Sequence, residues 1–269
     1  MNALKVNLFK NKTVAIIGSS GELEVNDYSK LINSVDIVVR VNVKTFNNNI
    51  FLPPKIKKNT TTRIDVLYHH GAQLGNQFKG DGNNKCVINK TSCISNENLA
   101  IFKKAGVKAV VLPNFNYKKC LKKKLGIQGL KIYPYPNLKL KNDIRISKGD
   151  AYPTTGISSI YDILQYSPSK LYIYGFDCYM APDTKLWFSD YSKIGNINMT
   201  KTENNVMGSH NTMCELQRLY NICKIYKDKV IITEHLSKTF IYNNLEQTNN
   251  LEQSNNLEQT NNLEQSNNL

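Results

Sequence analysis

The stretch KTVAIIGSSG, residues 12–21, joins an apolar run to a turn built from glycine and serine. A short apolar run that ends in turn residues is typical of a buried strand in a parallel sheet. The chain continues through a short helical turn at residues 27–32 to DIVVRV, residues 36–41, which is a second run of the same kind. Strands that alternate with helical segments in this way predict a mainly parallel sheet.

The same alternation continues along the chain and extends the predicted sheet. Further strands are predicted at Arg63–Tyr68, Val107–Leu112, Leu130–Tyr135, Leu171–Tyr174 and Val230–Thr233. Helices are predicted at Glu97–Ala105, Gly156–Tyr166 and Asn211–Lys227, the last with Met213, Leu216, Tyr220 and Cys223 facing inward. The expected fold class is therefore α/β, a Rossmann-type, mainly parallel sheet with helices on both faces. In such sheets ligands bind at the carboxyl ends of the strands.

Three connecting segments and the C-terminal end carry no strand or helix signal of this kind. Phe51–Thr62, with Pro53 and Pro54, is expected to be a loop, and Gly71–Asn96 a long loop or lid. Asn116–Leu125 is a basic helix or loop. From Leu245 the unit LEQ(T/S)NN repeats, and one leucine in six cannot build a helix stripe or a core. We expect a folded domain over residues 1–243 and a disordered tail over residues 244–269.

The chain is strongly basic, with 35 Lys and Arg against 21 Asp and Glu and a formal net charge of +14 at pH 7. Such a surface favours anionic partners, although a compositional bias toward Lys and Asn explains the charge equally well. The six cysteines form no C-x-x-C pair and stand in apolar stretches, which predicts reduced, buried thiols. With no signal peptide and no apolar run near the ~20 residues of a membrane helix, we expect a cytoplasmic protein without a transmembrane anchor.

The first candidate binding residues follow the first two strands. Backbone N–H groups of the turn Gly18-Ser19-Ser20-Gly21 can approach a phosphate or a base, and a plain tight turn is an equally good interpretation. At the end of the second strand, alternation places Arg40 and Asn42 on one face. A dinucleotide site favours Asp or Glu at this place, so the pair counts against NAD. Turn hydrogen bonds are the alternative role for Asn42.

A third candidate, Thr154-Thr155-Gly156 after Pro153, opens a predicted helix. Its hydroxyls and N–H groups suit a carboxylate or phosphate, and a simple N-cap is the alternative. A fourth, the segment Tyr174–Tyr179 with Asp177, follows a strand directly.

The fifth candidate is the segment SHNTMCE, residues 209–215, at the start of the last long helix. The helix dipole should lower the pKa of His210 there and keep the imidazole neutral, as a general base near pH 7 requires. A surface histidine without a role is the alternative. Glu215 lies about 140° around the helix from His210 if both are helical, so contact between them requires His210 to lie outside the helix.

In chain order, these segments resemble the sialylmotifs of sialyltransferases of glycosyltransferase family 29. VAIIGSSG with DIVVRVN resembles the large motif, YPTTGISSIYDILQYSPSKLYIYGFD the small motif, and HNTMCE the H-x-x-x-x-E of the very small motif. The chain is also similar to the bacterial sialyltransferases of family 42, through NDYSKLINSVDIVVRVN, GFDCY and HNT. The resemblance extends over about residues 13–220.

Both families have a GT-A-like nucleotide-binding fold, use CMP-sialic acid, invert the anomeric centre and need no metal. The absence of an Asp-x-Asp motif agrees with a metal-free site. The resemblance implies a transferase that moves sialic acid from CMP-sialic acid to a glycan hydroxyl without a cofactor. It implies that His210 takes the proton of the acceptor hydroxyl and that Tyr179 touches the leaving phosphate. The predicted substrate-binding residues are Gly18, Ser19, Ser20, Gly21, Arg40, Asn42, Thr154, Thr155, Gly156, Asp177 and Glu215.

The chain departs from the family 29 pattern at several positions. Ser19 replaces the loop Asn, and Thr13 stands where a Cys opens the large motif, so the usual disulfide cannot form. The third motif is reduced to Trp187, Phe188 and Asp190, without its His. These departures leave a second class open, a degenerate CMP- or nucleotide-binding protein without catalysis. A third class is a basic nucleic-acid-binding module. The Lys runs at 55–58 and 118–124 support it, but the sequence contains no recognisable nucleic-acid-binding motif.

Overall fold

The computed structural model of the chain describes residues 7–46, 49–52, 54–69, 96–113, 118, 127–135, 153–178, 180, 206–207 and 210–245. Seven strands within these ranges form one parallel sheet in the order β11-β8-β1-β2-β5-β6-β7. In chain order they are β1 (Thr13–Ile17), β2 (Ile37–Val41), β5 (Val66–Tyr68), β6 (Ala109–Pro113), β7 (Lys131–Tyr135), β8 (Lys170–Tyr174) and β11 (Val230–Ile232). Each predicted strand is therefore present, and all of them are parallel.

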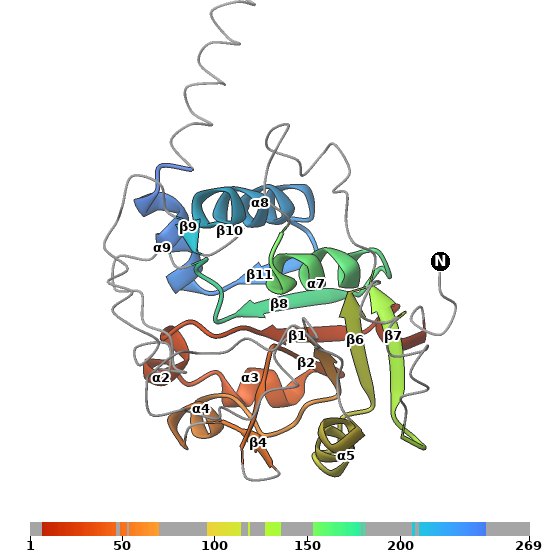
Figure 1. Ribbon diagram of the computed structural model, residues 1–269. Helices are drawn as coiled ribbons and strands as arrows, with labels where there is room; N and C mark the ends of the chain where they lie inside the picture. The colour runs from red at the N-terminus through yellow and green to blue at the C-terminus, as the bar shows by residue number, and fades with distance from the viewer. Residues whose placement is uncertain are drawn as a thin grey trace, which may run out of the picture.

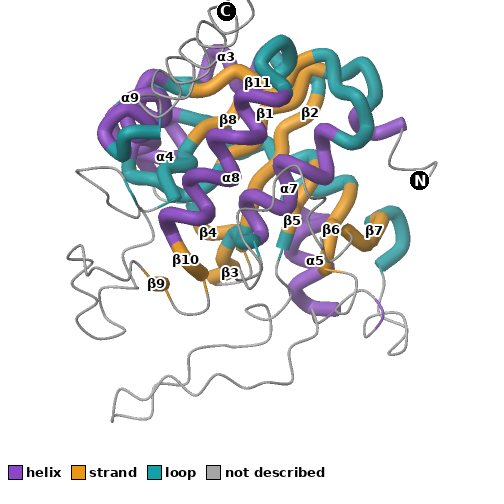
Figure 2. The backbone as a smooth tube through the Cα atoms, turned by 90° about the horizontal axis from the view of Figure 1, so that it is seen from above, coloured by secondary structure: helices purple, strands orange, loops and turns teal. Residues whose placement is uncertain are grey.

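Helices cover both faces of this sheet, which confirms the predicted fold class (Figure 1). One face carries α7 (Thr155–Leu164) and α8 (Thr212–Ile225), which lie side by side (Figure 2). The other face carries α3 (Ser29–Ser34), α4 (Pro54–Asn59) and α5 (Asn96–Lys104), and α2 (Glu22–Val25) lies beyond the end of β1. Because both faces are covered, the central strands are buried except at the first residue of β1 and of β2, as a near-continuous apolar sequence requires.

Two short antiparallel hairpins accompany the sheet. One pairs β3 (Lys44–Phe46) with β4 (Asn49–Phe51), and the other pairs β9 (Val206–Met207) with β10 (His210–Asn211). The second hairpin leads directly into α8. After β11 the chain forms α9 (Glu234–Tyr242), whose Leu236 and Phe240 are buried in the same core as α7 and α8.

The structure corrects the sequence-based prediction at two helices. The segment Phe51–Thr62, expected to be a loop, contains α4, which starts at Pro54, a residue well suited to a first helical position. Helix α9 was not predicted at all. Its signals are present, since Thr233 is an N-cap whose hydroxyl accepts a hydrogen bond from the Leu236 N–H at 3.2 Å.

The predicted inward face of α8 is also wrong in part. Leu216 is buried, but Met213, Tyr220 and Cys223 are only partly buried. The fully buried face instead comprises Thr212, Glu215, Leu216, Arg218, Leu219 and Ile222. Glu215 and Arg218 face inward because they form a buried ion pair. A prediction from hydrophobic pattern places charged residues such as these at the surface.

Other predictions fall partly or wholly on residues outside the described ranges. These include nearly all of Gly71–Asn96 and Asn116–Leu125 and the tail from residue 246 onward, so their predicted character stays a prediction. Leu245, the first leucine of the repeat, is described and is buried against the main core. Within the described ranges, Cys178, Cys214 and Cys223 are free thiols, as predicted, but they are half-buried rather than fully buried. The described part of the chain contains no helix long and apolar enough to cross a membrane.

The strand order identifies the place where a ligand would bind. From β1 the chain adds β2, β5, β6 and β7 on one side and β8 and β11 on the other. The order thus reverses between β1 and β8, and a parallel sheet opens a crevice at the carboxyl ends of the two strands that flank such a reversal. The loops that follow β1 and β8 carry two of the sequence motifs described above.

Candidate functional site

The loops after β1 and β8 are joined by backbone hydrogen bonds. The Gly18 N–H donates to the Tyr174 carbonyl at 2.8 Å, and the Ser19 and Ser20 N–H groups both donate to the Gly175 carbonyl at 2.9 Å. A Cβ atom on Gly18 would lie 2.3 Å from the Gly175 carbonyl oxygen, so only glycine fits. The N–H groups expected to approach a phosphate are therefore engaged with protein carbonyls. The N–H groups of Gly18, Ser19 and Ser20 thus hold the two loops together, and the predicted contact of these residues with a ligand stays a prediction.

The ring of Phe176 connects this pair of loops to helix α7. A Cβ atom on Gly18 would lie 3.0 Å from Phe176 Cδ2, and one on Gly156 would lie 2.8 Å from Cε1. The two glycines thus pack against opposite edges of one ring. The motif at the end of β1 and the motif at the start of α7, about 140 positions apart in the chain, are brought to the same place.

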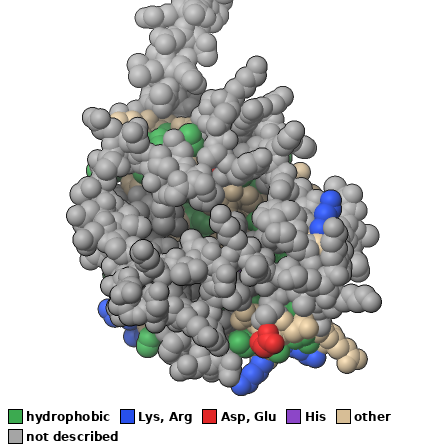
Figure 3. Space-filling view, in the orientation of Figure 1, with side chains coloured by type: hydrophobic (Ala, Val, Ile, Leu, Met, Phe, Trp, Pro, Cys, Tyr) green, Lys and Arg blue, Asp and Glu red, His purple; other side chains and the backbone are tan. Residues whose placement is uncertain are grey.

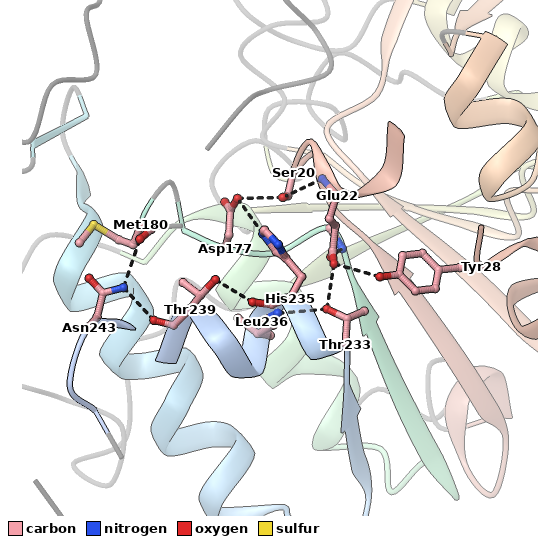
Figure 4. A network of polar contacts seen from close by, with 11 residues as sticks. Ser20, Glu22, Tyr28, Asp177, Met180, Thr233, His235, Leu236, Thr239 and Asn243 are labelled. Atoms are coloured by element: carbon pink, nitrogen blue, oxygen red, sulfur yellow. Dashed lines mark hydrogen bonds and ion pairs between the residues drawn. The ribbon is translucent and has the colours of Figure 1, made fainter. Parts of the chain in front are cut away.

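Asp177 forms the second link between the loops. Its Oδ2 accepts a hydrogen bond from Ser20 Oγ at 2.8 Å, and both residues are buried. His235 Nε2, from α9, lies 3.6 Å from the same oxygen (Figure 4). Ser20 and Asp177 were predicted site residues, whereas His235 was not, because the helix that carries it was not predicted.

Glu22, the first residue of α2, was not among the predicted site residues either. The residue is 3% exposed, and its carboxylate accepts a hydrogen bond from the Gly175 N–H at 2.5 Å. It also accepts from Thr233 Oγ1 at 2.9 Å and from Tyr28 Oη at 3.2 Å (Figure 4). Burial raises the pKa of Glu22, and the hydrogen bonds and the nearby His235 oppose that rise. The carboxyl group therefore joins the ends of β1, β8 and β11 at the reversal of strand order.

Glu215 of α8 lies at the N-terminus of α7. Its Oε2 accepts hydrogen bonds from the Thr154 N–H at 2.9 Å and from Thr154 Oγ1 at 2.7 Å. Its Oε1 pairs with Arg218 Nη1 at 2.6 Å. Thr154 is also the N-cap of α7, since its hydroxyl accepts from the Ile157 N–H at 3.3 Å. The helix start that was predicted to suit a carboxylate does hold one, but the carboxylate belongs to the protein.

The remaining residues at the start of α7 are Thr155 and Gly156. Thr155 is buried, and its side chain hydrogen-bonds with Tyr135 of β7. The first N–H groups of a helix have no partner within the helix, so the two residues present backbone donors at this end.

His210 and Tyr179 are the predicted catalytic residues. The structure describes the backbone of His210 in β10, where it pairs with Met207 two residues before α8 begins. His210 thus lies outside the helix, which is the condition for a contact with Glu215. Thr212, the first residue of α8, donates to Met180 Sδ at 3.2 Å and ties this junction to the loop after β8. Tyr179 lies outside the described residues.

Arg40 is not brought into this cluster. Arg40 is 1% exposed, and its Nη2 donates to Thr60 Oγ1 at 2.6 Å and to the Thr61 carbonyl at 2.8 Å. Burial lowers the pKa of Arg40 to about 10. By alternation Arg40 shares the face of Val38, which packs on the side opposite to α7. Its position therefore lends no support to the predicted substrate contact.

Asn42 adopts a left-handed backbone conformation with φ of 51°, and its N–H donates to the Tyr68 carbonyl at 2.9 Å. Asn tolerates this conformation better than most residues. The strand has ended by this point, so the alternation that was expected to place Arg40 and Asn42 on one face does not reach Asn42. A turn role, the alternative interpretation, fits its backbone.

Two further properties of the described residues bear on function. Within the described ranges, no cluster of three or more His, Cys, Asp or Glu residues is arranged to hold a metal ion. On the face shown in Figure 3, the described Lys and Arg side chains lie apart at the lower and right-hand rims rather than in one patch.

No protein-family model matches the chain, and no curated protein matches it. Similar solved structures include a mammalian sialyltransferase in complex with Gal-β-1,3-GalNAc-ortho-nitrophenol, at 16% identity and a TM-score of 0.49 over 86% of this chain and 72% of that one. A second mammalian sialyltransferase structure gives 15% identity and 0.49, over 83% and 69%. A variant of the sialyltransferase CST-II in complex with CMP gives 13% identity and 0.47, over 82% and 80%. All three of these solved structures are sialyltransferases.

Proposed function

We propose that this protein is a glycosyltransferase that moves sialic acid from CMP-sialic acid to a hydroxyl group of a glycan acceptor. The proposal includes inversion at the anomeric centre, His210 as general base and no required metal. One observation carries it: the segments that resemble sialylmotifs meet at the strand-order reversal. Gly18 and Gly156 pack against the same Phe176 ring, Ser20 binds Asp177, and Thr154 binds Glu215. A plain Rossmann-type sheet requires none of these contacts.

In the proposed reaction the acceptor hydroxyl oxygen attacks the anomeric carbon of sialic acid while its proton passes to His210. The bond from that carbon to the phosphate oxygen of CMP breaks, and CMP leaves with the electron pair. Because His210 stands just before the N-terminus of α8, the helix dipole favours its neutral form, which can accept the proton. Tyr179 would contact the departing phosphate, and hydrogen bonds stabilise the charge that develops there.

The start of α7 is the proposed site for the donor carboxylate or the cytidine. Because the N–H and hydroxyl of Thr154 already donate to Glu215, we assign the ligand to the N–H groups of Thr155 and Gly156. Ser19, which is only partly buried, would contact the nucleotide through its hydroxyl, because its N–H is engaged with Gly175. The acceptor would enter from the same end of the sheet.

The first test is calorimetric titration of the protein with CMP in EDTA, with UMP and NAD as controls. We expect selective, metal-independent binding of CMP, and a transfer assay with CMP-sialic acid should then show turnover. Binding of CMP without turnover of any acceptor supports the nucleotide-binding alternative. Retention on heparin that modest salt removes, with no effect of CMP, supports the nucleic-acid alternative.

The role of His210 has its own test. His210→Ala should abolish transfer and leave CMP affinity nearly unchanged, because a general base acts on the acceptor and not on the nucleotide. Asn211→Ala, the next residue of the same strand, serves as the matched control and should retain transfer. Equal loss of transfer and CMP affinity in His210→Ala would contradict the assignment of a general base.

A further inference from the structure

We propose that Glu22 is a positioning residue of the candidate site, which holds the loop after β8 and the C-terminal helix α9 in one arrangement. The inference rests on the proposed function only in taking CMP as the ligand. No sequence motif singled out Glu22, and its position follows from its hydrogen bonds.

Glu22 receives donors from three segments that are far apart in the chain. The Gly175 N–H belongs to the loop after β8, Thr233 to the N-cap of α9, and Tyr28 to the turn before α3. Hydrogen bonds to a carboxylate are stronger than those between neutral groups. A single side chain thus fixes three backbone segments at the reversal of strand order.

The bond to Gly175 determines where Asp177 lies. Gly175 has φ of +71°, and a Cβ atom there would lie 2.7 Å from Leu23 Cδ1, so its conformation and surroundings allow only glycine. Its N–H is held by Glu22, and its carbonyl is held by the N–H groups of Ser19 and Ser20. Asp177 follows two residues later and meets Ser20. A substitution that removes the Glu22 carboxylate therefore leaves the Gly175 N–H without this acceptor, while the Gly175 carbonyl stays bonded to Ser19 and Ser20.

The bond to Thr233 makes α9 a part of the site. The Thr233 hydroxyl donates to Glu22 and accepts from the Leu236 N–H, so it links the carboxylate to the first turn of the helix. His235 then lies 3.6 Å from Asp177. At the other end of α9, Asn243 Nδ2 donates to the Met180 carbonyl at 3.1 Å (Figure 4). Helix α9 is therefore attached at both ends to the loop that carries Asp177.

Stability alone does not explain a carboxylate at this position. Glu22 is buried, and the groups of Gly175, Thr233 and Tyr28 that donate to it are neutral. Burial raises the pKa of Glu22 by more than these hydrogen bonds lower it. Apolar residues replace buried charged groups in many proteins without loss of stability. Titratable groups held in an unfavourable environment gather at functional sites.

The experiment compares Glu22→Met with Glu24→Met, which removes the same charge from the same helix but not from the network. Amide hydrogen exchange is followed over residues 170–178 and 234–242 at a temperature where melting shows each variant fully folded. Exchange in both segments should be roughly tenfold faster in Glu22→Met, as expected for the loss of a hydrogen bond to a charged group. Glu24→Met should match the wild type. Glu22→Gln should retain most protection, because its carbonyl can accept from Gly175 and its amide can donate to the two hydroxyls.

CMP affinity is measured on the same proteins, and it should also fall about tenfold in Glu22→Met and stay near the wild-type value in Glu22→Gln. If Glu22→Met does not fold, Thr233→Asp tests the link to α9, because it keeps an N-cap acceptor but removes the donor to Glu22. Wild-type exchange in both segments of a folded Glu22→Met or Thr233→Asp protein would overturn the inference. The exchange measurement needs no nucleotide, so failure of the wild type to bind CMP refutes the proposed function alone.

Discussion

Glu22 and Glu215 occupy comparable places in the molecule and are held in opposite ways. Each lies in the first turn of a helix, each is 3% exposed, and each joins segments that carry sequence motifs. Glu215 is paired with the guanidinium of Arg218 in addition to its bonds with Thr154. The recorded hydrogen bonds of Glu22 come from neutral donors, and burial raises its pKa. The charge of Glu215 is thus compensated by Arg218, whereas burial of Glu22 disfavours its charged form.

The largest effect is expected at Glu215. Glu215→Met breaks the ion pair with Arg218, itself 1% exposed, and removing one partner of a buried ion pair costs about 3–5 kcal/mol. Urea unfolding should show a loss of that size. The double variant Glu215→Met/Arg218→Met should recover much of it, since the remaining charge is also removed. A double variant as unstable as the single one would show that the ion pair is not the source of the loss.

The pH dependence of stability should reveal Glu22. Its folded-state pKa lies above the ordinary value of 4.5, so the folded protein holds the proton more tightly than the unfolded chain. The contribution of Glu22 to the free energy of unfolding is therefore fully present below about pH 4.5 and is lost as pH rises through the folded-state pKa.

The measurement is the difference in free energy of unfolding between wild type and Glu22→Gln at steps from pH 4 to 8. The wild type should lose stability relative to Glu22→Gln across this rise, because glutamine does not titrate. His235, which lies beside Asp177, also faces the group, and both residues remain in each protein. A difference that is constant with pH, or that changes in the opposite direction, contradicts the raised pKa.

The smallest effect is expected at Tyr28. Tyr28→Phe removes the hydroxyl that donates to Glu22 at 3.2 Å and that also interacts with Thr233 and Asn26, and a single hydrogen bond is worth about 0.5–1.5 kcal/mol, or up to ~3 to a charged group. The ring contact of Tyr28 with Tyr174 should survive, so the loss should lie near the lower figure. A loss as large as that of Glu215→Met would mean that Tyr28, and not Glu22, organises this region.

Much of the fold was predictable because its strands are continuous apolar runs. VAII and DIVVRV could be assigned as strands from their own residues. Strands of a parallel sheet are buried on both faces, so they read as nearly continuous apolar runs instead of alternating ones. The helix predicted at Gly156–Tyr166 from the helical spacing of its apolar residues lies at Thr155–Leu164, with Thr154 as its cap. Helix α9 offered the same kinds of signal in Thr233, Leu236 and Phe240, but they are few and lie next to a low-complexity repeat.

The candidate site was predictable in its parts but not in its connections. Thr154 and Glu215 were both named, yet their contact joins positions 61 residues apart and has no local signature. Arg40 was named for its charge and strand-end position, and the structure buries it under Thr60 and Thr61.

The sequence by itself determined the α/β class, the order of most strands and helices along the chain and the motif residues that surround the reversal of strand order. Those properties depend on hydrophobic pattern and turn chemistry, which act over a few neighbouring residues. Only the tertiary structure decided that Gly18 and Gly156 share one aromatic ring, that Glu215 occupies the start of α7, and that Glu22 connects β8 to α9. Each of these contacts joins distant positions, and a buried polar group takes its partner from whatever donors the packing brings within reach.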